Sequence, residues 1–502
     1  MKSLVHRIAA AVAVGALSFA GAPVALAQTP TGVETTPAPA PAAPAGVIDP
    51  SAQVSLTINK YIGEVGNTAT PAPDSPQINF KIEKVSGVDL TTQDGWTTLA
   101  GLTAANAPID SGFAAVTLPI VGGKATIDTA TNSAFTVGVY KVTELNTAGY
   151  STAAPFLVTL PYNGTDGTWQ YNQTVNPKNQ NVQPNKQADD SQATLGGNMT
   201  YTINAPVPAG EMDRFNIVDP MQAGLTLNAG SAVVTATGAT PPTLAVGTDY
   251  TITDTGNTLR VDFTDAGITK LETARTTDPT LQVSVKFTAK VTSIPTTGQI
   301  VNTATIELPN GASVTTDVPV DTDPNTPDGP TSTNYGNLTI TKTGGTATEM
   351  NGAQFQVYQC QPDAANAGKY QLLGTPLTVA TTADGTATAD TLTTANDTVQ
   401  AFGLPASSFS GGATGTVTNQ YCVLETKAPA GFVRDPEPRP VTYTAGTNAA
   451  GTFTVTVNNV KDSIIGQLPA TGAWGIVILF LLGLLLLARG LYTSYKDNKA
   501  AV

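Results

Sequence analysis

Short runs in which apolar and polar residues alternate recur along most of the chain. Typical runs lie at 54–60, 199–203 and 283–287, and glycine, proline, asparagine and aspartate separate one run from the next. A period of two places neighbouring side chains on opposite faces of a strand, so one face of each run should enter a core. Because the runs are short and bounded by turn residues, we predict an all-β chain built from β-sandwiches.

The first and last thirds of this β region carry one pattern twice. Each copy has a strand ending on lysine, a later strand ending on glutamate and a final strand ending on asparagine: Lys60, Glu144 and Asn179 in the first copy, and Lys342, Glu425 and Asn459 in the last. The lysine-to-glutamate spacing is 84 residues (144 − 60) in one copy and 83 (425 − 342) in the other. The agreement predicts two diverged copies of one folding unit.

The middle third fits a sandwich of another kind. A segment rich in proline and aspartate, 321–336, separates it from the last third. There Asp321, Asp323 and Asn325 alternate as in a calcium loop, but the glycine comes late, at Gly329, and no glutamate closes the loop. We therefore favour an acidic hinge and predict no metal site.

These patterns predict three tandem domains with a linker in front. We place the domains at 53–181, 182–333 and 334–463. Residues 28–52 contain the run PAPAPAAPAG, which has too little apolar surface to fold and should form a stiff, extended linker.

Residues 1–27 have the pattern of a secretory signal peptide. Lys2 and Arg7 precede an apolar run at 8–20, and Ala25-Leu26-Ala27 forms a small-x-small cleavage site. The only histidine is His6, so cleavage would leave no imidazole for a triad, a general base or a metal. This argues against most hydrolases, although a serine or carboxylate-pair mechanism stays open, and we predict neither an enzyme nor a cofactor.

The charge of the chain limits its partners. Only 12% of the 502 residues are charged and the net charge is −13, so no basic patch is expected and we predict no nucleic-acid binding. Cys360 and Cys422 are the only thiols, and an exported chain meets an oxidising exterior. A disulfide between them would close 62 residues (422 − 360) and contribute ~4 kcal/mol; two buried free thiols are the alternative.

Strand parity turns the repeated polar residues toward the cores. Lys342 shares a face with Leu338 and Ile340, and Glu425 shares one with Tyr421 and Val423. Scattered separately, such groups would each cost ~2 kcal/mol, so we expect lysine, glutamate and asparagine to meet. Desolvation favours a neutral amine beside a protonated acid, and the amine can then attack the carboxamide while the acid shuttles protons and ammonia leaves. An ordinary buried salt bridge is the alternative.

The C-terminal segment combines three features in a fixed order. Leu468-Pro469-Ala470-Thr471-Gly472 precedes an apolar stretch at 473–492, long enough to span a bilayer, and a cationic tail at 493–502. A plain membrane anchor explains the last two features but not the pentapeptide. The pentapeptide resembles the LPxTG signal of sortase substrates in Gram-positive bacteria. That resemblance implies that a sortase cysteine attacks the Thr471 carbonyl and releases Gly472, so that an amine resolves the acyl-enzyme.

The segment YCVLETKAPAGF at 421–432 resembles the E-box of Cna B-type domains, which are Ig-like sandwiches with internal isopeptide bonds. The resemblance implies Lys342–Asn459 and Lys60–Asn179 bonds, with Glu425 and Glu144 as the catalytic acids. The middle domain is similar to the Cna A-type fold, in which aspartate replaces glutamate. Our candidates there are Lys186, Asp219 and Asn302, with Lys270 and Lys290 as alternatives to Lys186.

The segment WQYNQTVNPKN at 169–179 resembles the pilin motif WxxxVxVYPK, whose lysine accepts the sortase acyl group. Gln173 and Asn176 depart from it. The resemblance assigns the acceptor role to Lys178, which parity turns outward, and Pro177 should leave it on an exposed rim. A solvated strand lysine is the alternative.

Together these features resemble the LPxTG-anchored major pilins of Gram-positive sortase-assembled pili. The resemblance implies a shaft subunit on the cell surface, anchored in the wall after passing through the membrane, with Thr471 joined to Lys178 of the next copy. Implied partners are pilus-class and housekeeping sortases, other copies of the chain, minor pilins, peptidoglycan and a possible host receptor. A wall-anchored adhesin or minor pilin is the alternative function.

Overall fold

The computed structural model describes residues 46–63, 69–147, 149–317, 329–410, 413–414, 420–462 and 471–499. The predicted signal peptide, most of the linker, residues 321–328 of the predicted acidic hinge and residues 468–470 of the pentapeptide lie outside these ranges. The chain forms two compact units, one from 1–335 with 405–418 and the other from 336–404 with 419–502. The three domain boundaries predicted from the sequence stay a prediction.

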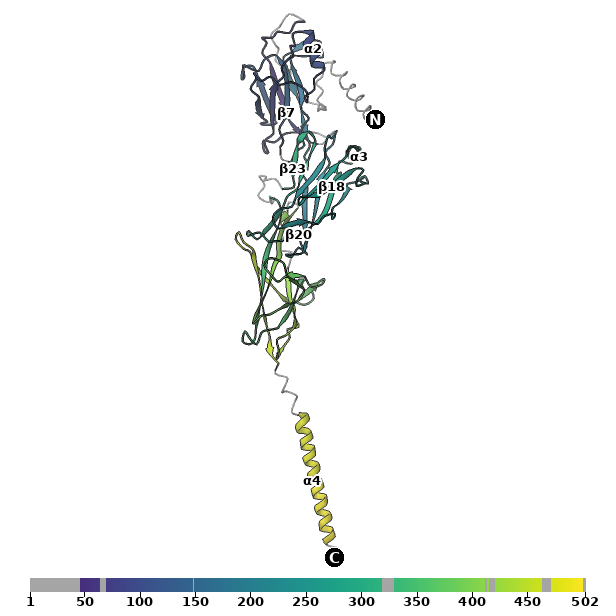
Figure 1. Cartoon of the computed structure of the whole chain (residues 1–502), viewed down its shortest axis with the longest axis vertical. Coiled ribbons are helices and arrows are strands. Elements are labelled where there is room, and N and C mark those ends of the chain that lie inside the picture. The colour runs from purple at the N-terminus through teal and green to yellow at the C-terminus, as the bar shows by residue number, and fades with distance from the viewer. Residues whose placement is uncertain are drawn as a thin grey trace. The chain divides into compact units, whose positions relative to one another are not determined.

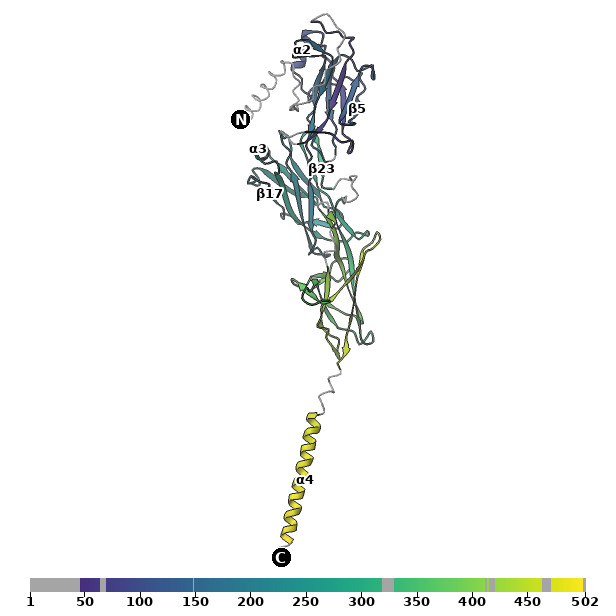
Figure 2. The same ribbon diagram turned by 180° about the vertical axis from the view of Figure 1, so that it is seen from behind.

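The first sandwich lies in the first unit. One sheet has the order β11-β1-β6 and a facing sheet the order β5-β4-β7-β8 (Figure 1; β5 is marked in Figure 2). Its main strands are β1 (Ser55–Asn59), β4 (Asn79–Lys84), β5 (Val116–Pro119), β6 (Lys124–Asp128), β7 (Gly138–Glu144), β8 (Phe156–Leu160) and β11 (Asn172–Val175). Short strands are β2 (Tyr61–Ile62), β3 (Thr70–Pro71), β9 (Tyr162–Asn163), β10 (Trp169–Gln170) and β12 (Lys178–Asn179). The apolar faces of the two sheets form one core that includes Leu56, Phe80 and Tyr140.

The second sandwich, also in the first unit, has sheets of order β13-β14-β20-β16 and β18-β19-β15-β22-β23. Figures 1 and 2 mark β18, β20 and β23, and β17, which pairs with β20. The strands are β13 (Asn185–Asp189), β14 (Asn198–Pro206), β15 (Asn216–Pro220), β16 (Leu225–Leu227), β17 (Val233–Thr237), β18 (Tyr250–Thr255), β19 (Thr258–Phe263), β20 (Gln282–Val291), β21 (Gln299–Asn302), β22 (Thr305–Glu307) and β23 (Ser313–Thr315). A single 3-10 turn, η1 (Pro309–Gly311), connects β22 to β23.

The third sandwich occupies the second unit apart from the ends of two long strands and the short strand β31 (Ala413–Thr414). β24 (Thr331–Thr343) lies between β30 (Thr398–Ser410) and β36 (Gly451–Asn458), and the other sheet has the order β26-β25-β32-β34. The remaining strands are β25 (Gln354–Pro362), β26 (Tyr370–Leu373), β27 (Val379–Ala380), β28 (Thr388–Ala389), β29 (Leu392–Thr393), β31 (Ala413–Thr414), β32 (Tyr421–Lys427), β33 (Phe432–Val433), β34 (Arg439–Pro440), β35 (Thr442–Thr444) and β37 (Val460–Lys461).

The first and third sandwiches share an uncommon strand pairing. In the first, β1 pairs in parallel with β11, and in the third β24 pairs in parallel with β36. In each case an early strand of the sandwich lies beside a late one, pointing the same way. This is the arrangement expected of two copies of one unit, and it places residues more than 100 positions apart side by side at the strand ends.

Two helices that the alternation pattern did not reveal cover the sandwiches, α2 (Gln93–Ala100) and α3 (Asp265–Arg275). Both begin with a threonine cap, Thr92 or Thr264, whose hydroxyl accepts a hydrogen bond from a glycine N–H three residues later. At each of these glycines a Cβ would lie within 2 Å of a backbone carbonyl oxygen, of Asp89 or of Asp249. Only glycine therefore allows such close approach of helix and strand connection.

The C-terminal helix α4 (Thr471–Lys499) includes the stretch at 473–492 that the sequence predicts to span a membrane. Figure 1 shows α4 as the helix that ends the chain. Side chains of 471–477 lie outside the described residues, and from Ile478 to Leu487 the large apolar side chains are exposed. Within the part of the chain that the structure describes, no helix combines the length and the apolar character needed to cross a membrane.

Candidate crosslinking sites in the sandwich cores

The third sandwich brings Lys342, Glu425 and Asn459 together in its core. Each of these residues is at most 3% exposed. Lys342 Nζ donates to Asn459 Oδ1 and, at 3.0 Å, to the carbonyl oxygen of Val457, and it lies 3.4 Å from Glu425 Oε1. Asn459 Nδ2 donates to the same carboxylate oxygen at 2.9 Å. The amine, the carboxamide and the carboxylate therefore form a closed ring of contacts.

The surroundings of this triad fix the carboxylate and exclude water. The backbone N–H of Asp435 donates to Glu425 Oε2 at 2.6 Å, and the Asp435 carboxylate accepts from Arg439 Nε at 2.6 Å. The Phe355 ring lies 6.0 Å from Lys342 Nζ. Burial lowers the pKa of Lys342, and the nearby Glu425 carboxylate offsets part of that effect.

The first sandwich repeats the arrangement with Lys60, Glu144 and Asn179. Lys60 Nζ donates to Glu144 Oε2 at 2.8 Å and to Asn179 Oδ1 at 2.6 Å, and Asn179 Nδ2 donates to Glu144 Oε1. The N–H of Ala153 donates to Glu144 Oε2 at 3.0 Å, in the place that Asp435 N–H takes in the third sandwich. Burial lowers the pKa of Lys60, and the Phe80 ring lies 5.4 Å from its amine.

The second sandwich pairs Lys186 of β13 with Asp219 of β15 across its two sheets. Lys186 Nζ donates to Asp219 Oδ2, and the rings of Tyr201 and Phe287 lie 4.7 and 5.6 Å from the amine. Asn302, at the end of β21, is fully buried, as are both charged partners. Asp219 Oδ1 and Asn302 Oδ1 are buried without a hydrogen-bond partner, a costly state for polar oxygens.

Burial shifts the pKa of both charged groups of this second site. It lowers the pKa of Lys186 to about 8 and raises the pKa of Asp219, because desolvation outweighs the attraction between them. The two alternative lysines lie elsewhere: Lys270 pairs with Asp249 at 2.5 Å near the surface, and Lys290 lies on the exposed face of β20. Of the three lysines, Lys186 alone contacts Asp219.

All three sites hold the groups that amide exchange requires. A buried lysine with a lowered pKa readily gives up its proton, and the adjacent carboxylate can accept it. The resulting neutral amine can attack the asparagine carbonyl carbon, so that a C–N bond forms, the old carboxamide C–N bond breaks and ammonia carries away the amide nitrogen. The carboxylic acid supplies the proton that the leaving nitrogen needs. Only side chains of the chain itself take part.

Lys178 lies in β12 beside Tyr61 of β2, one residue before Asn179. Its neighbours Pro177 and Asn179 are buried and Lys178 is half-buried, so the alternation is as predicted and the rim that carries Lys178 is partly covered. The parallel pairing with β2 covers one side of the strand. Of the two departures from the motif, Asn176 is accommodated, since its Oδ1 accepts from Asn59 Nδ2 at 3.0 Å. Gln173 is buried with its Oε1 lacking a hydrogen-bond partner.

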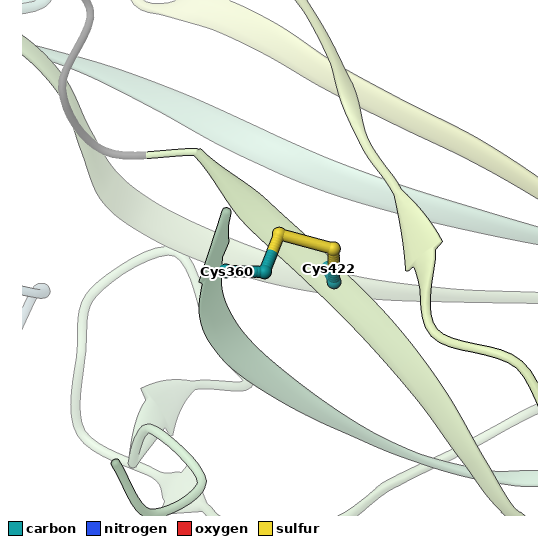
Figure 3. Close-up of a disulfide and its surroundings, with 2 residues drawn as sticks. All are labelled: Cys360 and Cys422. Atoms are coloured by element: carbon teal, nitrogen blue, oxygen red, sulfur yellow. A yellow bond between two sulfur atoms is a disulfide. The ribbon is translucent and has the colours of Figure 1, made fainter. Parts of the chain in front are cut away.

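The predicted disulfide is confirmed. Cys360 of β25 and Cys422 of β32 are bonded, with Cα atoms 5.7 Å apart (Figure 3). The bridge ties β25 to the strand that carries Glu425, three residues further along. It therefore stiffens the frame of the third site without taking part in it.

Sequence reasoning missed the groups that orient the carboxylates. The donors to Glu144 and Glu425 are backbone N–H groups of Ala153 and Asp435, and a backbone donor leaves no residue-type signal. The donors follow their glutamates by 9 and 10 residues in the sequence. This similar spacing is the signal that a comparison of the two repeats could have used to find them.

The fold defines a class, proteins built from tandem β-sandwiches with buried lysine, carboxylate and asparagine side chains in their cores. Residues 336–461 match the SpaA prealbumin-like fold domain, and residues 76–180 match the N-terminal domain, D1, of Gram-positive pilin subunits. Fimbrial subunit type 1 of Actinomyces viscosus is 32% identical over 94% of this chain and 95% of its own length. Fimbrial subunit type 2 of Actinomyces naeslundii is 30% identical, covering 90% and 92%.

Among solved structures, the full-length major pilin SpaD from Corynebacterium diphtheriae superposes with a TM-score of 0.59 and 26% identity. The match covers 83% of this chain and 99% of that one. The chain therefore belongs to the family of Gram-positive fimbrial subunits, and its fold is similar to that of a major pilin. These are structural, cell-surface proteins rather than enzymes, and their copies polymerise.

Proposed function

We propose that this chain is the shaft subunit of a covalent pilus and that it is crosslinked at two levels. Between subunits, a sortase joins the Thr471 carbonyl of one copy to the Lys178 amine of the next. Within each subunit, Lys60–Asn179, Lys186–Asn302 and Lys342–Asn459 bonds form, assisted by Glu144, Asp219 and Glu425 respectively.

The observation that carries the proposal is the position of the triads on the strand pairs. In the third sandwich β24 and β36 run parallel in register, with Lys342 opposite Val457 and Asn459 two residues beyond. Pulling on the two ends of such a sandwich shears these two strands apart, because an early strand and a late strand are neighbours. A Lys342–Asn459 bond would carry that load through covalent atoms. The first sandwich offers the same geometry through β1, β11 and β12.

The proposal assigns the remaining parts of the chain as follows. The pentapeptide at 468–472 is read by pilus-class and housekeeping sortases, and the segment at 473–492 holds the precursor at the membrane until cleavage. Minor pilins and peptidoglycan are further partners, and a host receptor is conceivable only for an adhesive role. A wall-anchored adhesin or minor pilin would need the C-terminal signal but not Lys178.

Polymerisation in the producing cell tests the proposal. Lys178→Ala should abolish the high-mass ladder that wall extracts of the wild type give on a denaturing gel. Lys141→Ala is the matched control, since Lys141 is another half-buried strand lysine of the first sandwich. A ladder that survives in Lys178→Ala refutes the acceptor, and a wild-type chain that wall extracts contain only as a monomer would favour the adhesin or minor pilin.

A further inference from the structure

Among the described residues, side-chain amides form hydrogen bonds between the first and second sandwiches at three places. Asn146 Nδ2 donates to the Ser313 carbonyl oxygen at 3.2 Å and Asn146 Oδ1 accepts from Ser313 N–H at 3.3 Å. Gln180 pairs with the backbone of Ala209 in the same two-way manner, at 2.9 and 2.7 Å. Asn310 Nδ2 donates to the Thr152 carbonyl oxygen at 3.0 Å.

Each contact attaches next to a member of the first triad. Asn146 follows Glu144 by two residues, and Gln180 directly follows Asn179. Thr152 directly precedes Ala153, whose N–H orients the Glu144 carboxylate. The second sandwich thus contacts side chains that lie within two residues of Glu144 and Asn179, and the backbone next to the donor Ala153.

The loop that carries Thr152 and Ala153 is itself joined to the strand of Asn179. Ser151 N–H donates to the Gln180 carbonyl oxygen at 2.9 Å, and Gln180 N–H donates to Ser151 Oγ at 2.9 Å. A displacement of this loop therefore moves both the donor to Glu144 and the segment that holds the carboxamide.

In the third sandwich, residues of the same sandwich hold the corresponding loop. There the donor to Glu425 belongs to Asp435, whose carboxylate is held by Arg439 at 2.6 Å and by the N–H of Glu437 at 3.1 Å. Alanine stands at the corresponding place in the first sandwich, so the residue that donates to the glutamate has no polar side chain of its own to fix it. Asn310 of the second sandwich supplies an anchor one residue away.

We propose that the second sandwich positions the first triad, so that the Lys60–Asn179 bond forms only after the loops carrying Ala209, Asn310 and Ser313 have folded and docked. This inference rests on the proposed internal crosslinking. The reaction is the same in the first and third sandwiches: the lysine Nζ forms a bond to the asparagine Cγ, the Cγ–Nδ2 bond breaks, and one ammonia leaves. Asn146, Gln180 and Asn310 are positioning residues. The Lys342–Asn459 bond needs no such partner and forms independently.

The test follows the two crosslinks separately in one molecule. The full chain is synthesised in a short pulse, samples are quenched in acid over time, and proteolytic peptides are assayed by mass spectrometry for the Lys60–Asn179, Lys186–Asn302 and Lys342–Asn459 linkages. The variant is Asn146→Ala with Asn310→Gly. Asn310 has φ 60°, a left-handed conformation that glycine adopts freely, so the backbone is preserved. Asn448→Gly, at φ 53° on the exposed surface of the third sandwich, is the matched control.

The double variant removes three hydrogen bonds between the sandwiches. We expect it to slow the Lys60–Asn179 linkage at least about five-fold, the effect of one such bond, while Lys342–Asn459 keeps its wild-type rate. The Lys186–Asn302 linkage reports in the same sample that the second sandwich is folded. Gln180→Ala, which changes no residue of the second sandwich, should slow the same linkage.

Lys60–Asn179 formation at the wild-type rate in both variants overturns the inference, as does equal slowing of all three linkages. A wild-type chain that never forms Lys60–Asn179 contradicts the internal crosslinking itself, and the positioning role with it.

Discussion

Replacement of Glu425 by alanine removes the carboxylate that contacts both partners of the third triad. Lys342 and Asn459 stay adjacent, but the group that takes up and returns the proton is gone. The chain should therefore fold without the Lys342–Asn459 bond and keep one ammonia more than the wild type in this sandwich.

The thermodynamic consequence follows from the loop that the bond closes. Lys342 and Asn459 are 117 positions apart in the sequence. The disulfide already closes a loop of 62 of these positions, so the crosslink closes an effective loop of 55 residues (117 − 62). Chain entropy then gives the crosslink about 4 kcal/mol. The region that matches the prealbumin-like domain has 126 residues (461 − 336 + 1). With an unfolding entropy of about 2.1 cal/mol/K per residue, the loss lowers the melting temperature of this sandwich by roughly 15 °C.

Intact mass and calorimetry of the same sample measure the two effects. Asn459→Ala, a second uncrosslinked variant, should show a similar drop, whereas Glu437→Ala, which loses surface ion pairs to Lys369 and Arg439, should keep the crosslink and melt near the wild type. The reasoning is refuted by a Glu425→Ala chain that still loses the ammonia, or by an uncrosslinked chain that melts at the wild-type temperature.

Further predictions concern the second site, the disulfide and the first site. In an uncrosslinked Asn302→Ala chain, folded Lys186 with a pKa of about 8 binds fewer protons than unfolded lysine at 10.5, so the free energy of unfolding should rise between these two pH values. Urea titrations at a series of pH values measure this slope, which should vanish when Lys186→Met is added; a slope that persists contradicts the assignment to Lys186. Cys360→Ala with Cys422→Ala should still form the Lys342–Asn459 bond, since the disulfide lies outside the triad, and peptide mapping that finds this bond missing would contradict the separation of the two roles. Glu144→Gln should leave Lys60 and Asn179 unlinked while the other two crosslinks form, which peptide mapping measures; a Lys60–Asn179 linkage in that variant would contradict the role of Glu144.

Side-chain parity was enough to predict which polar residues meet in the first and third cores. A strand has only two faces, so Lys342 and Glu425 had to share the core with the apolar residues two positions away, and the cost of isolated burial implied contact. The nearly equal lysine-to-glutamate spacing in the first copy then predicted the same roles for Lys60 and Glu144. Lys186 was harder to assign because its strand has little apolar alternation, and only the sheet pairing of β13 with β14 brings it over Tyr201 and Asp219.

Other features depend on backbone geometry that residue types do not encode. The N–H groups of Ala153 and Asp435 act through position alone, and the short helices α2 and α3 depend on close approach at Gly95 and Gly267. Lys178 alternates as predicted, yet the pairing of β12 with β2 half-covers it, which parity within one strand could not reveal. The contacts of Asn310 and Gln180 join separate sandwiches, and no local pattern predicts such long-range contacts.

The intact mass of the folded, purified chain tests the central claim most directly. Each internal amide releases one ammonia, so for a recombinant chain without its signal peptide three buried triads predict a mass three ammonias below that calculated from the expressed residues, in addition to the two hydrogens lost to the disulfide. A mass that departs from the sequence by the disulfide alone would contradict the account.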